Sequence, residues 1–599
     1  MLKKFHQFVC CSGIIFLMLF ADSCANIVTP TGGPKDVTPP QPKAYEPVNF
    51  SANFKEHKIK ITFNEFITLE DQANQIVVSP PLKDDPEYVV KGKSLLINLP
   101  KELKDSVTYT IYFGESIRDI TENNILSGLQ YAFSTGNHID SLTITGTVTD
   151  ALTLEPGKGV FVMLYRSVDD SAPMKHKPDY ITKSNSAGLF TLNNLANARY
   201  KIFVLADLNS NLLFDQPTEA IAFADSLVKP YYIPRIKDTA SAKKDTSSVK
   251  KNSGPVKKDT INIKKDTLKM PVVNNQVNLR MFLQPDTIQK LLKARSSKYG
   301  QFKLYFKYPV SELSLKVKNK ALPDNWRLDE YAKTRDTVTC WLTNPAIDTL
   351  KYNVLDKGVL IDSVDMVLKQ KNVAATQPKK PSGKGTSNDE NSIKPVVYFN
   401  AKSGNPFPYY VPLTIGITNP VSETDFSKVT LSEKVDSNFK VLPIVPMNPE
   451  TSVKRYFTIN QTWKPKTKYQ IMVLPGAFKD IYGNVNDSAK VIFTPNSVDD
   501  YGRVLFTLKS KNFQSPYIVQ LLSDSKMVLS EKIVSSQGQL IFENLAPGNY
   551  HIRVIRDANK NGKWDSGDYF KKNQPEQVFS FPEVINIRAN WDSEFEFTL

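Results

Sequence analysis

Two stretches of this 599-residue chain repeat one another and decide its architecture. The first, residues 186–215, reads S-A-G-L-F-T-L-N-N-L-A-N-A-R-Y-K-I-F-V-L-A-D-L-N-S-N-L-L-F-D, and the second, residues 536–565, reads S-Q-G-Q-L-I-F-E-N-L-A-P-G-N-Y-H-I-R-V-I-R-D-A-N-K-N-G-K-W-D. Equivalent positions lie a constant 350 residues apart, as Tyr200 and Tyr550 do. An ungapped match of this length indicates a duplicated module.

The composition around this repeat is that of a globular, β-rich protein. Apolar residues make up 41% of the chain and charged residues 23%. Short runs rich in Val, Ile, Thr, Tyr and Phe recur, such as T-Y-T-I-Y-F at 108–113, whereas long segments with helical periodicity do not. These runs predict β-strands, and the length predicts several domains. We therefore expect an all-β protein made of tandem β-sandwich domains.

The net charge of +15 raises the question of nucleic-acid binding. Residues 236–270 alone hold ten Lys and four Asp, and residues 369–394 are also Lys-rich. Much of the positive charge therefore lies in two low-complexity segments rather than on a folded face. We interpret both segments as extended, disordered linkers whose like charges repel one another, and we expect no nucleic-acid partner.

The N-terminus has the features of an export signal. Two lysines precede an apolar run, Phe8–Phe20, which is too short for a stable membrane span. Small residues then lead to Cys24 in an arrangement that resembles the lipobox of bacterial lipoproteins, although Asp22 stands where a small residue is commoner. The resemblance implies that residues 1–23 are removed and that Cys24 is lipidated. The alternative is ordinary secretion with cleavage near 21–25.

Cysteine usage fits a lipid-anchored, exported protein. Of the four cysteines, Cys10 and Cys11 lie in the signal and Cys24 would carry the lipid, so Cys340 is left without a disulfide partner. Two or three acyl chains anchor a protein firmly, whereas one chain binds only marginally. Ala25 is not an acidic retention signal, so the resemblance to Gram-negative lipoproteins implies sorting to the outer membrane.

Two domains, at 44–137 and 395–499, show features of one family. The first has R-D-I-T-E-N-N before its last strand, and the second has K-D-I-Y-G-N in the corresponding place. These elements resemble the bacterial Ig-like domain of surface-layer proteins, in which a D-x-x-G-N turn is typical. Gly483 provides the expected glycine in the second domain, whereas Glu122 occupies its place in the first.

The repeated stretch lies in two further domains, which follow the Ig-like ones. Their strand order resembles the transthyretin-like, carboxypeptidase-regulatory or Cna-B group of seven-stranded sandwiches, for which L-A-P-G-N-Y at 545–550 is typical. An Ig-like domain followed by a transthyretin-like domain therefore occurs twice. The expected plan is a signal peptide at 1–23, a lipidated stalk at 24–43, an Ig-like domain at 44–137, a transthyretin-like domain at 138–235, a disordered linker at 236–270, a degenerate β-sandwich at 271–368, a second linker at 369–394, a second Ig-like domain at 395–499 and a second transthyretin-like domain at 500–599.

An ion site is the most specific chemical hypothesis that the repeat offers. Residues 557–568 carry oxygen-bearing side chains at positions 1, 3, 5, 9 and 12 of the run and a glycine at position 6, which is the spacing of a calcium loop. The candidate calcium ligands are Asp557, Asn559, Asn561, Asp565 and Asp568. No other cofactor is expected.

The first copy of this loop is a poorer match to a calcium site. It keeps four of the candidate ligands but has Leu212 in place of the glycine and Thr218 at position twelve, with Glu219 one residue later. We expect weak binding or none at these four residues, which are Asp207, Asn209, Asn211 and Asp215. For both loops, the alternative is an Asx-rich turn that holds no ion.

No pattern of catalytic residues occurs in the sequence. The metalloprotease, serine-hydrolase, redox and phosphate-loop motifs are all absent. The histidines that follow the signal are widely separated, at His57, His138, His176 and His551. We therefore expect a protein that is not an enzyme.

These features predict an exported, lipid-anchored cell-envelope protein that acts as a structural or interaction scaffold, for example in adhesion. Its partners would be the membrane and an unidentified envelope protein or polysaccharide. One alternative is a glycan-binding accessory protein of the outer membrane, for which Trp326, Trp341 and Trp564 are candidate platforms if they do not serve the core. A further alternative is a hydrolase with an unrecognised site.

Overall fold

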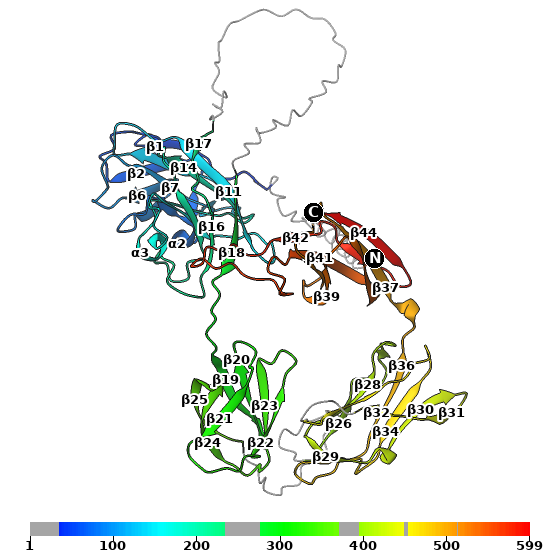
Figure 1. The fold of residues 1–599 in the computed structure, drawn as a ribbon. Helices are drawn as coiled ribbons and strands as arrows, with labels where there is room; N and C mark the ends of the chain where they lie inside the picture. Colours follow the sequence, from blue (N-terminus) through cyan, green and yellow to red (C-terminus); the bar gives the residue numbers. More distant parts are fainter. Residues whose placement is uncertain (1–34, 234–275, 370–393, 448–452, 512) are drawn as a thin grey trace, which may run out of the picture. The chain divides into compact units, whose positions relative to one another are not determined.

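The computed structural model describes residues 35–233, 276–369, 394–447, 453–511 and 513–599 (Figure 1). The predicted signal peptide, Cys24 and almost all of both Lys-rich segments lie outside these residues. The chain divides into two compact units: unit 1 comprises Met1–Gln284 and Ser566–Pro575, and unit 2 comprises Pro285–Asp565 and Glu576–Leu599.

Regular structure in the described residues is almost entirely β-strand, so the predicted all-β fold of tandem sandwiches is confirmed. None of the described helices is long and apolar enough to cross a membrane. The helical turns are α2 (Gln72–Gln75), α3 (Ala172–Lys175) and the 3-10 turns η1 (Phe426–Lys428) and η2 (Val498–Asp500).

Sandwich 1 opens unit 1 and shows how alternation makes its core. In β2, K-I-K-I-T-F buries Ile59, Ile61 and Phe63 and directs Lys58 toward solvent. Its sheets have the strand orders β1-β2-β6-β5, β10-β7-β4 and β3-β8-β9. The strands are β1 (Pro42–Glu46), β2 (Lys58–Phe63), β3 (Ile67–Leu69), β4 (Val77–Ser79), β5 (Glu87–Lys91), β6 (Ser94–Asn98), β7 (Thr108–Tyr112), β8 (Ile117–Asp119), β9 (Ile125–Leu126) and β10 (Gln130–Ser134).

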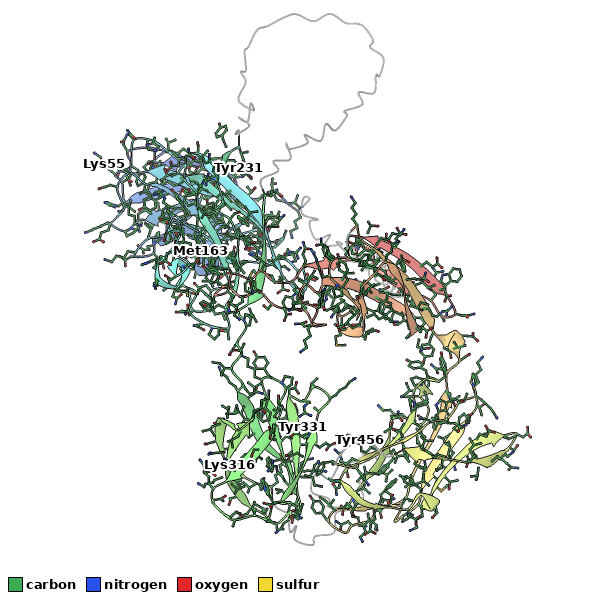
Figure 2. The ribbon with its side chains drawn as sticks, viewed as in Figure 1. Lys55, Met163, Tyr231, Lys316, Tyr331 and Tyr456 are labelled. Atoms are coloured by element: carbon green, nitrogen blue, oxygen red, sulfur yellow. The ribbon has the colours of Figure 1, made fainter. Side chains whose placement is uncertain are left out.

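Sandwich 2 completes unit 1 and contains the first copy of the repeat. Its strands pair in the order β13-β12-β15-β16-β18-β11-β14, and β17 also pairs with β11. Met163 on β12 is fully buried (Figure 2). The strands are β11 (Leu142–Asp150), β12 (Phe161–Tyr165), β13 (Tyr180–Lys183), β14 (Leu189–Leu195), β15 (Lys201–Leu205), β16 (Ala220–Phe223), β17 (Tyr231–Tyr232) and β18 (Val277–Leu283).

The position of β18 corrects the domain plan. The sequence assigned residues 277–283 to the middle sandwich, but β18 pairs in parallel with β11 and antiparallel with β16, so it is the last strand of sandwich 2. The approach is close, since a Cβ on Gly146 would lie 2.0 Å from the Val277 carbonyl oxygen. The Lys-rich segment at 236–270 is therefore an insertion within this domain. Local pattern could not reveal a pairing across so long an insertion.

Sandwich 3 opens unit 2 with two sheets, ordered β19-β20-β23-β22 and β21-β24-β25. Phe302, Tyr352 and Cys340 are buried between them. Burial raises the pKa of the Cys340 thiol, which is unpaired. The strands are β19 (Leu291–Lys298), β20 (Gln301–Phe306), β21 (Leu313–Val317), β22 (Arg327–Tyr331), β23 (Thr337–Leu342), β24 (Thr349–Asp356) and β25 (Val359–Val367).

Sandwich 4 has sheets ordered β26-β28-β33-β32, β27-β36-β34-β30-β31 and β29-β35. Phe457, Tyr469 and Phe478 fill its core. The strands are β26 (Val397–Phe399), β27 (Pro406–Phe407), β28 (Leu413–Ile417), β29 (Val421–Thr424), β30 (Val429–Val435), β31 (Asn438–Leu442), β32 (Pro446–Met447), β33 (Tyr456–Ile459), β34 (Tyr469–Val473), β35 (Phe478–Asp480) and β36 (Ala489–Pro495).

Sandwich 5 contains the second copy of the repeat. Its sheets are ordered β40-β37-β44 and β39-β38-β41-β42, and β43 also pairs with β41. β44 pairs in parallel with β37, as β18 does with β11 in sandwich 2. The strands are β37 (Gly502–Lys509), β38 (Tyr517–Ser523), β39 (Val528–Val534), β40 (Gly538–Leu545), β41 (Gly548–Arg556), β42 (Val578–Ser580), β43 (Ile585–Ile587) and β44 (Asp592–Thr598).

The two copies of the repeat also share side-chain hydrogen bonds. The Tyr200 hydroxyl donates to the Ala196 carbonyl over 2.8 Å, and the Tyr550 hydroxyl donates to the Ala546 carbonyl over 2.7 Å. The same tyrosine therefore closes the same turn in sandwiches 2 and 5, which is what a duplicated module predicts.

Candidate functional site

The loop from Asp557 to Asp565 is organised around one buried carboxylate. Asp557 is 1% exposed, and it accepts hydrogen bonds from the backbone N–H of Asn561 (3.1 Å) and Gly562 (2.9 Å). The side chains of Asn559 and Asn561 both donate to Oδ2 of Asp565, at 2.5 and 2.6 Å. Four of the five predicted ligands therefore converge on one loop.

A residue that the sequence analysis missed, Glu576, closes this loop. Its Oε1 accepts from the Ala558 N–H over 2.7 Å, and its Oε2 accepts from the Asp565 N–H over 3.1 Å. Burial raises the pKa of Glu576, and the charges of Asp565 and Asp557 raise it further. The loop is thus closed by a carboxylate that comes from a separate segment of the chain.

Asp568, the predicted twelfth-position ligand, is engaged elsewhere. It belongs to unit 1, where its Oδ1 accepts from Gln284 Nε2 (2.7 Å) and from the backbone N–H of Phe570 and Lys571. It also forms a 3.0 Å ion pair with the Lys571 ammonium. The acidic residue placed to complete the loop in unit 2 is Glu576, eleven positions beyond Asp565 in the printed sequence.

The first copy repeats this geometry in unit 1. Asp207 accepts from the N–H of Ser210 (2.7 Å) and Leu212 (2.9 Å), while Asn209 and Asn211 donate to Asp215. Its closing residue is Glu219, which is fully buried and accepts from the N–H groups of Leu208, Asp215 and Gln216. Glu219, noted in the sequence as one position late, thus has the role that Glu576 has in the second copy.

Leu212 and Gly562 provide a matched test of backbone strain in the two loops. Both are left-handed, with φ of 61° and 73°, and this conformation disfavours any residue with a Cβ. We expect Leu212→Gly to stabilise sandwich 2 by up to about 1 kcal/mol and Gly562→Leu to destabilise sandwich 5 by about 1–2 kcal/mol. Thermal unfolding of the two variants measures both effects. A loss of stability in Leu212→Gly would contradict the strain argument.

The donor set of the second loop fits calcium chemically. Each carboxylate oxygen that accepts one amide hydrogen keeps a further lone pair, and a half-turn of either asparagine amide would present its carbonyl oxygen toward Asp565. Among the described residues, however, no group of three or more His, Cys, Asp or Glu side chains is gathered closely enough to hold a metal ion. Amide and backbone oxygens would have to complete the coordination.

Sandwiches 1 and 4 each have a buried aspartate at the turn that the Ig-like resemblance singled out. Asp119 accepts from the N–H of Glu122, Asn123 and Asn124, and Asp480 accepts from the N–H of Tyr482 and Asn484. Burial opposes ionisation of Asp119, but these amides hold its pKa below the usual value. The left-handed residue is Asn123 (φ 64°), so Asn123, and not Glu122, corresponds to Gly483 (φ 82°).

Unit 2 contains a set of charged and aromatic contacts between sandwiches 3 and 4, which we call the joint. Its main residues are Glu330, Trp341, Lys298 and Arg455. Glu330 on β22 accepts two hydrogen bonds from Arg455 Nη1, at 2.8 and 2.9 Å, and a third from the indole nitrogen of Trp341 at 2.8 Å. The side chains of Arg455 and Glu330 are only 13% and 21% exposed. Arg455 also donates through Nε to the Ile417 carbonyl, and its guanidinium lies 5.3 Å from the centroid of the Tyr456 ring. Tyr456 is labelled in Figure 2.

Trp341 is the centre of this joint. This residue is 1% exposed, and two cations lie near its ring, with Lys298 Nζ 4.6 Å and the Arg455 guanidinium 4.8 Å from the ring centroid. Lys298 donates across the joint to the Thr418 carbonyl, and the Tyr482 hydroxyl donates back to the Leu342 carbonyl over 3.0 Å. Burial, and then the charge of Arg455, lower the pKa of Lys298 to about 8. Sandwiches 3 and 4 are therefore joined by specific side-chain contacts.

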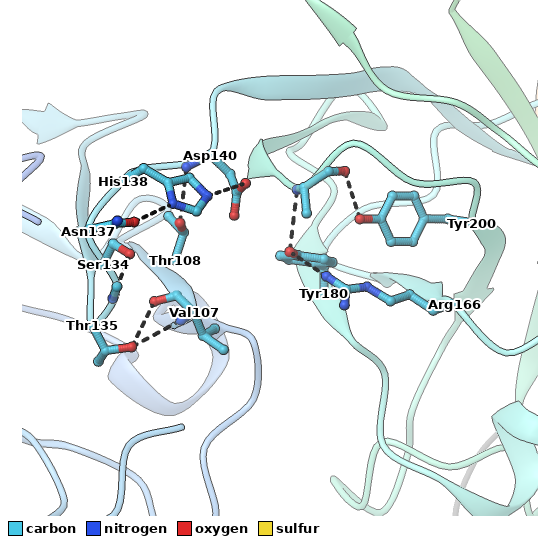
Figure 3. A network of polar contacts seen from close by, with 12 residues as sticks. Val107, Thr108, Ser134, Thr135, Asn137, His138, Asp140, Arg166, Tyr180 and Tyr200 are labelled. Atoms are coloured by element: carbon cyan, nitrogen blue, oxygen red, sulfur yellow. Dashed lines mark hydrogen bonds and ion pairs between the residues drawn. The ribbon is translucent and has the colours of Figure 1, made fainter. Parts of the chain in front are cut away.

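The histidines do not assemble a catalytic group. His138 is 71% exposed, its Nδ1 lies 3.0 Å from Asn137 Oδ1, and its Nε2 lies 3.8 Å from Asp140 (Figure 3). The nearby Ser134 hydroxyl accepts from the Gly136 N–H and contacts neither of these side chains within the part of the chain that the structure describes. The arrangement is a polar turn and not a nucleophile–base–acid series.

Of the three tryptophans considered as glycan platforms, two serve the core, which was the alternative that the sequence left open for them. Trp326 and Trp341 are 7% and 1% exposed, and Trp564 is half-buried with its indole N–H on the Glu576 carbonyl. The exposed tryptophan is Trp591, at 63%, which the sequence analysis did not single out. The exposure of Trp591 could not be predicted from the sequence, because the residue lies just before the last strand, where a buried core residue is equally common.

Residues 566–575 are packed within unit 1 beside sandwich 2. The Tyr569 ring lies 5.0 Å from Phe203 and 5.1 Å from Phe223, and its hydroxyl donates to the Asp170 carbonyl over 2.7 Å. These side chains line a cavity of about 370 Å³ in which Lys572 pairs with the Asp170 carboxylate. The aromatic rings contact one another, so we interpret this region as a packing cluster.

Comparisons with known proteins support the fold class. A family model described as a bacterial Ig-like domain matches residues 36–135, which form sandwich 1. No curated protein matches the chain. Native alpha-2-macroglobulin from Escherichia coli, spanning domains MG0-NIE-MG1, is 12% identical over 50% of this chain and 97% of that one, with a TM-score of 0.17.

Other solved structures give similarly low scores. The major pilin subunit BcpA of Bacillus cereus is 10% identical over 48% of this chain and 93% of that one, with a TM-score of 0.13. The SGBP-B protein of the Bacteroides ovatus mixed-linkage glucan utilization locus, solved with a heptasaccharide, is 6% identical over 84% and 99%, with a TM-score of 0.17. The family model therefore supports an Ig-like domain at residues 36–135, and the specific function of the chain rests on its own residues.

Proposed function

We propose that this protein is a non-enzymatic lipoprotein of the cell envelope that acts as a structural or interaction scaffold. Anchored at Cys24, it would present its sandwiches to an envelope protein or polysaccharide, most simply from the outer membrane. The observation that carries the proposal is the joint around Trp341. A scaffold must hold consecutive domains in a fixed relative position. The Arg455–Glu330 contact links two sandwiches in this way, through side chains that are largely buried.

The use of the buried carboxylates supports the non-enzymatic part of the proposal. Buried carboxylates in the described residues, such as Asp119 and Asp480, are occupied by backbone amides that shape turns. This use of a carboxylate is structural, because its lone pairs stabilise a fixed loop conformation. The alternative hydrolase would need a free acid–base pair in a cleft.

Lipidation at Cys24 is tested directly in cells. With labelled palmitate in the medium, the full-length chain is expected to become labelled and to sediment with membranes, and Cys24→Ala is expected to lose both properties. Cys11→Ser, a change in the same N-terminal segment, should remain labelled. Lipidation at Cys24 would be contradicted if the label entered Cys24→Ala as strongly as the wild type, or if the wild type took up no label.

We also propose that calcium stabilises the second Asp/Asn loop, with Asp557 and Asp565 as its carboxylate ligands and Asn559 and Asn561 as amide ligands, while Glu576 closes the loop by accepting backbone N–H groups. When bound, the ion would neutralise the charges of the two aspartates and rigidify the loop. The first loop, with Leu212 at the glycine position, is expected to respond more weakly. The role of the ion would be structural, in keeping with a scaffold.

A further inference from the structure

A cleft at the beginning of sandwich 5 combines exposed aromatic rings with unpaired polar groups. The cavity has a volume of about 550 Å³ and lies within unit 2. Tyr409, Tyr501 and Trp591 supply its aromatic surface. Its size is in the range of about 300–1,000 Å³ that is typical of small-ligand pockets.

Trp591 is displayed on a fixed turn. The turn is held on one side by the Asn590 N–H, which donates to the Tyr501 carbonyl over 2.9 Å, and on the other by the Trp591 carbonyl, which accepts from the Arg503 N–H over 3.0 Å. Asn590 is left-handed, with φ of 54°. The backbone is therefore well determined, while the ring itself is 63% exposed. An exposed ring held at a fixed position is available as a flat binding surface.

The two tyrosines are also held in place. The Tyr409 and Tyr501 rings lie 5.9 Å apart, and Tyr410 packs on both. The Tyr409 hydroxyl donates to Oδ1 of Asn544 over 2.6 Å, which fixes the amide. Among the described residues no acceptor is found for the Nδ2 donors of Asn544, which lines the cleft. Those donors are available to a ligand.

The charged groups of the cleft define the ligand that it can accept. Arg503 is neutralised by two hydrogen bonds to Asp592, at 2.8 and 2.5 Å. Glu543 and Asp499 also line the cavity, so its lining holds three carboxylates and one guanidinium, and the charge of Glu543 acts on Arg503 more weakly than that of Asp592. The cleft therefore carries excess negative charge, which repels anionic ligands and offers acceptors to neutral hydroxyl donors.

We propose that this cleft binds a neutral oligosaccharide. The C–H face of a pyranose ring carries partial positive charge and packs on the negative face of an aromatic ring such as Trp591. The sugar hydroxyls would donate to Glu543 and accept from the Asn544 amide. Uronate-containing or sulfated glycans would be excluded by the carboxylates. This inference rests on the proposed scaffold, for which it names the class of polysaccharide partner, but its test depends on neither the lipid anchor nor the calcium loop.

The test is a titration of the full-length Cys24→Ala chain with four neutral hexasaccharides and one anionic one. Cellohexaose, xylohexaose, mannohexaose and maltohexaose are compared with hexagalacturonate by calorimetry and by tryptophan fluorescence. At least one neutral hexamer is expected to bind and to change the fluorescence of the exposed indole. Trp591→Ala should weaken that binding at least 10-fold and abolish the spectral change, and Glu543→Gln should weaken it several-fold.

Phe66→Ala is the matched control, because the Phe66 ring is 57% exposed in sandwich 1, in the other unit. It should leave the affinity unchanged. Circular dichroism establishes that each variant is folded, as expected for substitutions of exposed side chains. The proposal is overturned if none of the four neutral hexamers binds at millimolar concentration, if hexagalacturonate binds more tightly than they do, or if binding survives Trp591→Ala.

Discussion

Replacing Arg455 by alanine is expected to lower the free energy of unfolding of sandwiches 3 and 4 by about 3 kcal/mol. The change removes both hydrogen bonds to Glu330 and leaves a carboxylate that is only 21% exposed without a cation. It also removes one of the two cations that lie on the Trp341 ring. Urea unfolding of the full-length Cys24→Ala chain, followed through tryptophan fluorescence, measures the loss.

Two companion variants separate the ion pair from general packing at this joint. In a double-mutant cycle, Glu330→Gln combined with Arg455→Ala should be less destabilising than the sum of the single changes, because the two side chains contact one another. Lys298→Met should cost less than Arg455→Ala, about 1 kcal/mol, because it removes the hydrogen bond to the Thr418 carbonyl but leaves the Arg455–Glu330 pair in place. Burial already disfavours the charged form of Lys298, whose pKa is about 8, and methionine keeps most of the contact with Trp341. If the effects of the two changes were additive in the cycle, Arg455 and Glu330 would not stabilise the joint through their contact.

Calcium is expected to raise the unfolding midpoint of sandwich 5. A ligand that binds the folded state alone stabilises it by about 2.7 kcal/mol at a concentration 100-fold above Kd, which is roughly 10 °C for a domain of this size. Few carboxylates and an exposed loop suggest an extracellular-type Kd of about 10⁻⁴–10⁻³ M, so 10 mM calcium is compared with chelator. Magnesium at the same concentration is the control ion, because its smaller octahedral shell fits the loop poorly.

Three substitutions identify which carboxylates bind the ion. Asp557→Ala should abolish the calcium response. It should also destabilise the ion-free protein by about 2–3 kcal/mol, because the backbone N–H groups of Asn561 and Gly562 lose their acceptor. Glu576→Gln should weaken the response without abolishing it, because Glu576 closes the loop through the amides of Ala558 and Asp565. Asp568→Asn should keep the response, since Asp568 is committed to Gln284 and its own turn.

Asp207→Ala is the matched change in the first copy. It should destabilise sandwich 2, whose loop it caps, while leaving the calcium response of sandwich 5 intact. An unchanged midpoint in calcium for the wild-type chain would contradict the ion site. Both loops would then be Asx turns whose carboxylates serve backbone amides alone.

Much of the fold follows from local sequence, because its strands alternate strictly. The run at Lys58–Phe63 and the repeat around Tyr200 and Tyr550 predicted strands and a duplicated sandwich, and the structure has them. The pairing of β18 with β11 could not be predicted in this way. Parallel pairing across an insertion leaves no periodic signal, and Val277–Leu283 reads equally well as the first strand of the next domain.

The candidate sites show the same division between local and long-range information. Asp557, Asn559, Asn561 and Asp565 were found because a tight loop places its polar residues at fixed spacing. Glu576 was missed because it reaches the loop from a separate segment. The joint around Trp341 was missed as well, since Glu330 and Arg455 lie 125 residues apart and each reads alone as an ordinary surface charge.

The central claim is that consecutive sandwiches form a stiff scaffold, and a distance distribution across the joint tests it most directly. Spin labels at Lys333→Cys in sandwich 3 and Lys440→Cys in sandwich 4 occupy exposed positions of a chain in which Cys10, Cys11 and Cys24 are replaced by alanine and Cys340 is buried. Electron–electron double resonance is predicted to give one narrow distance peak in the wild-type background and a broad distribution after Arg455→Ala. A broad distribution in both chains would contradict the scaffold.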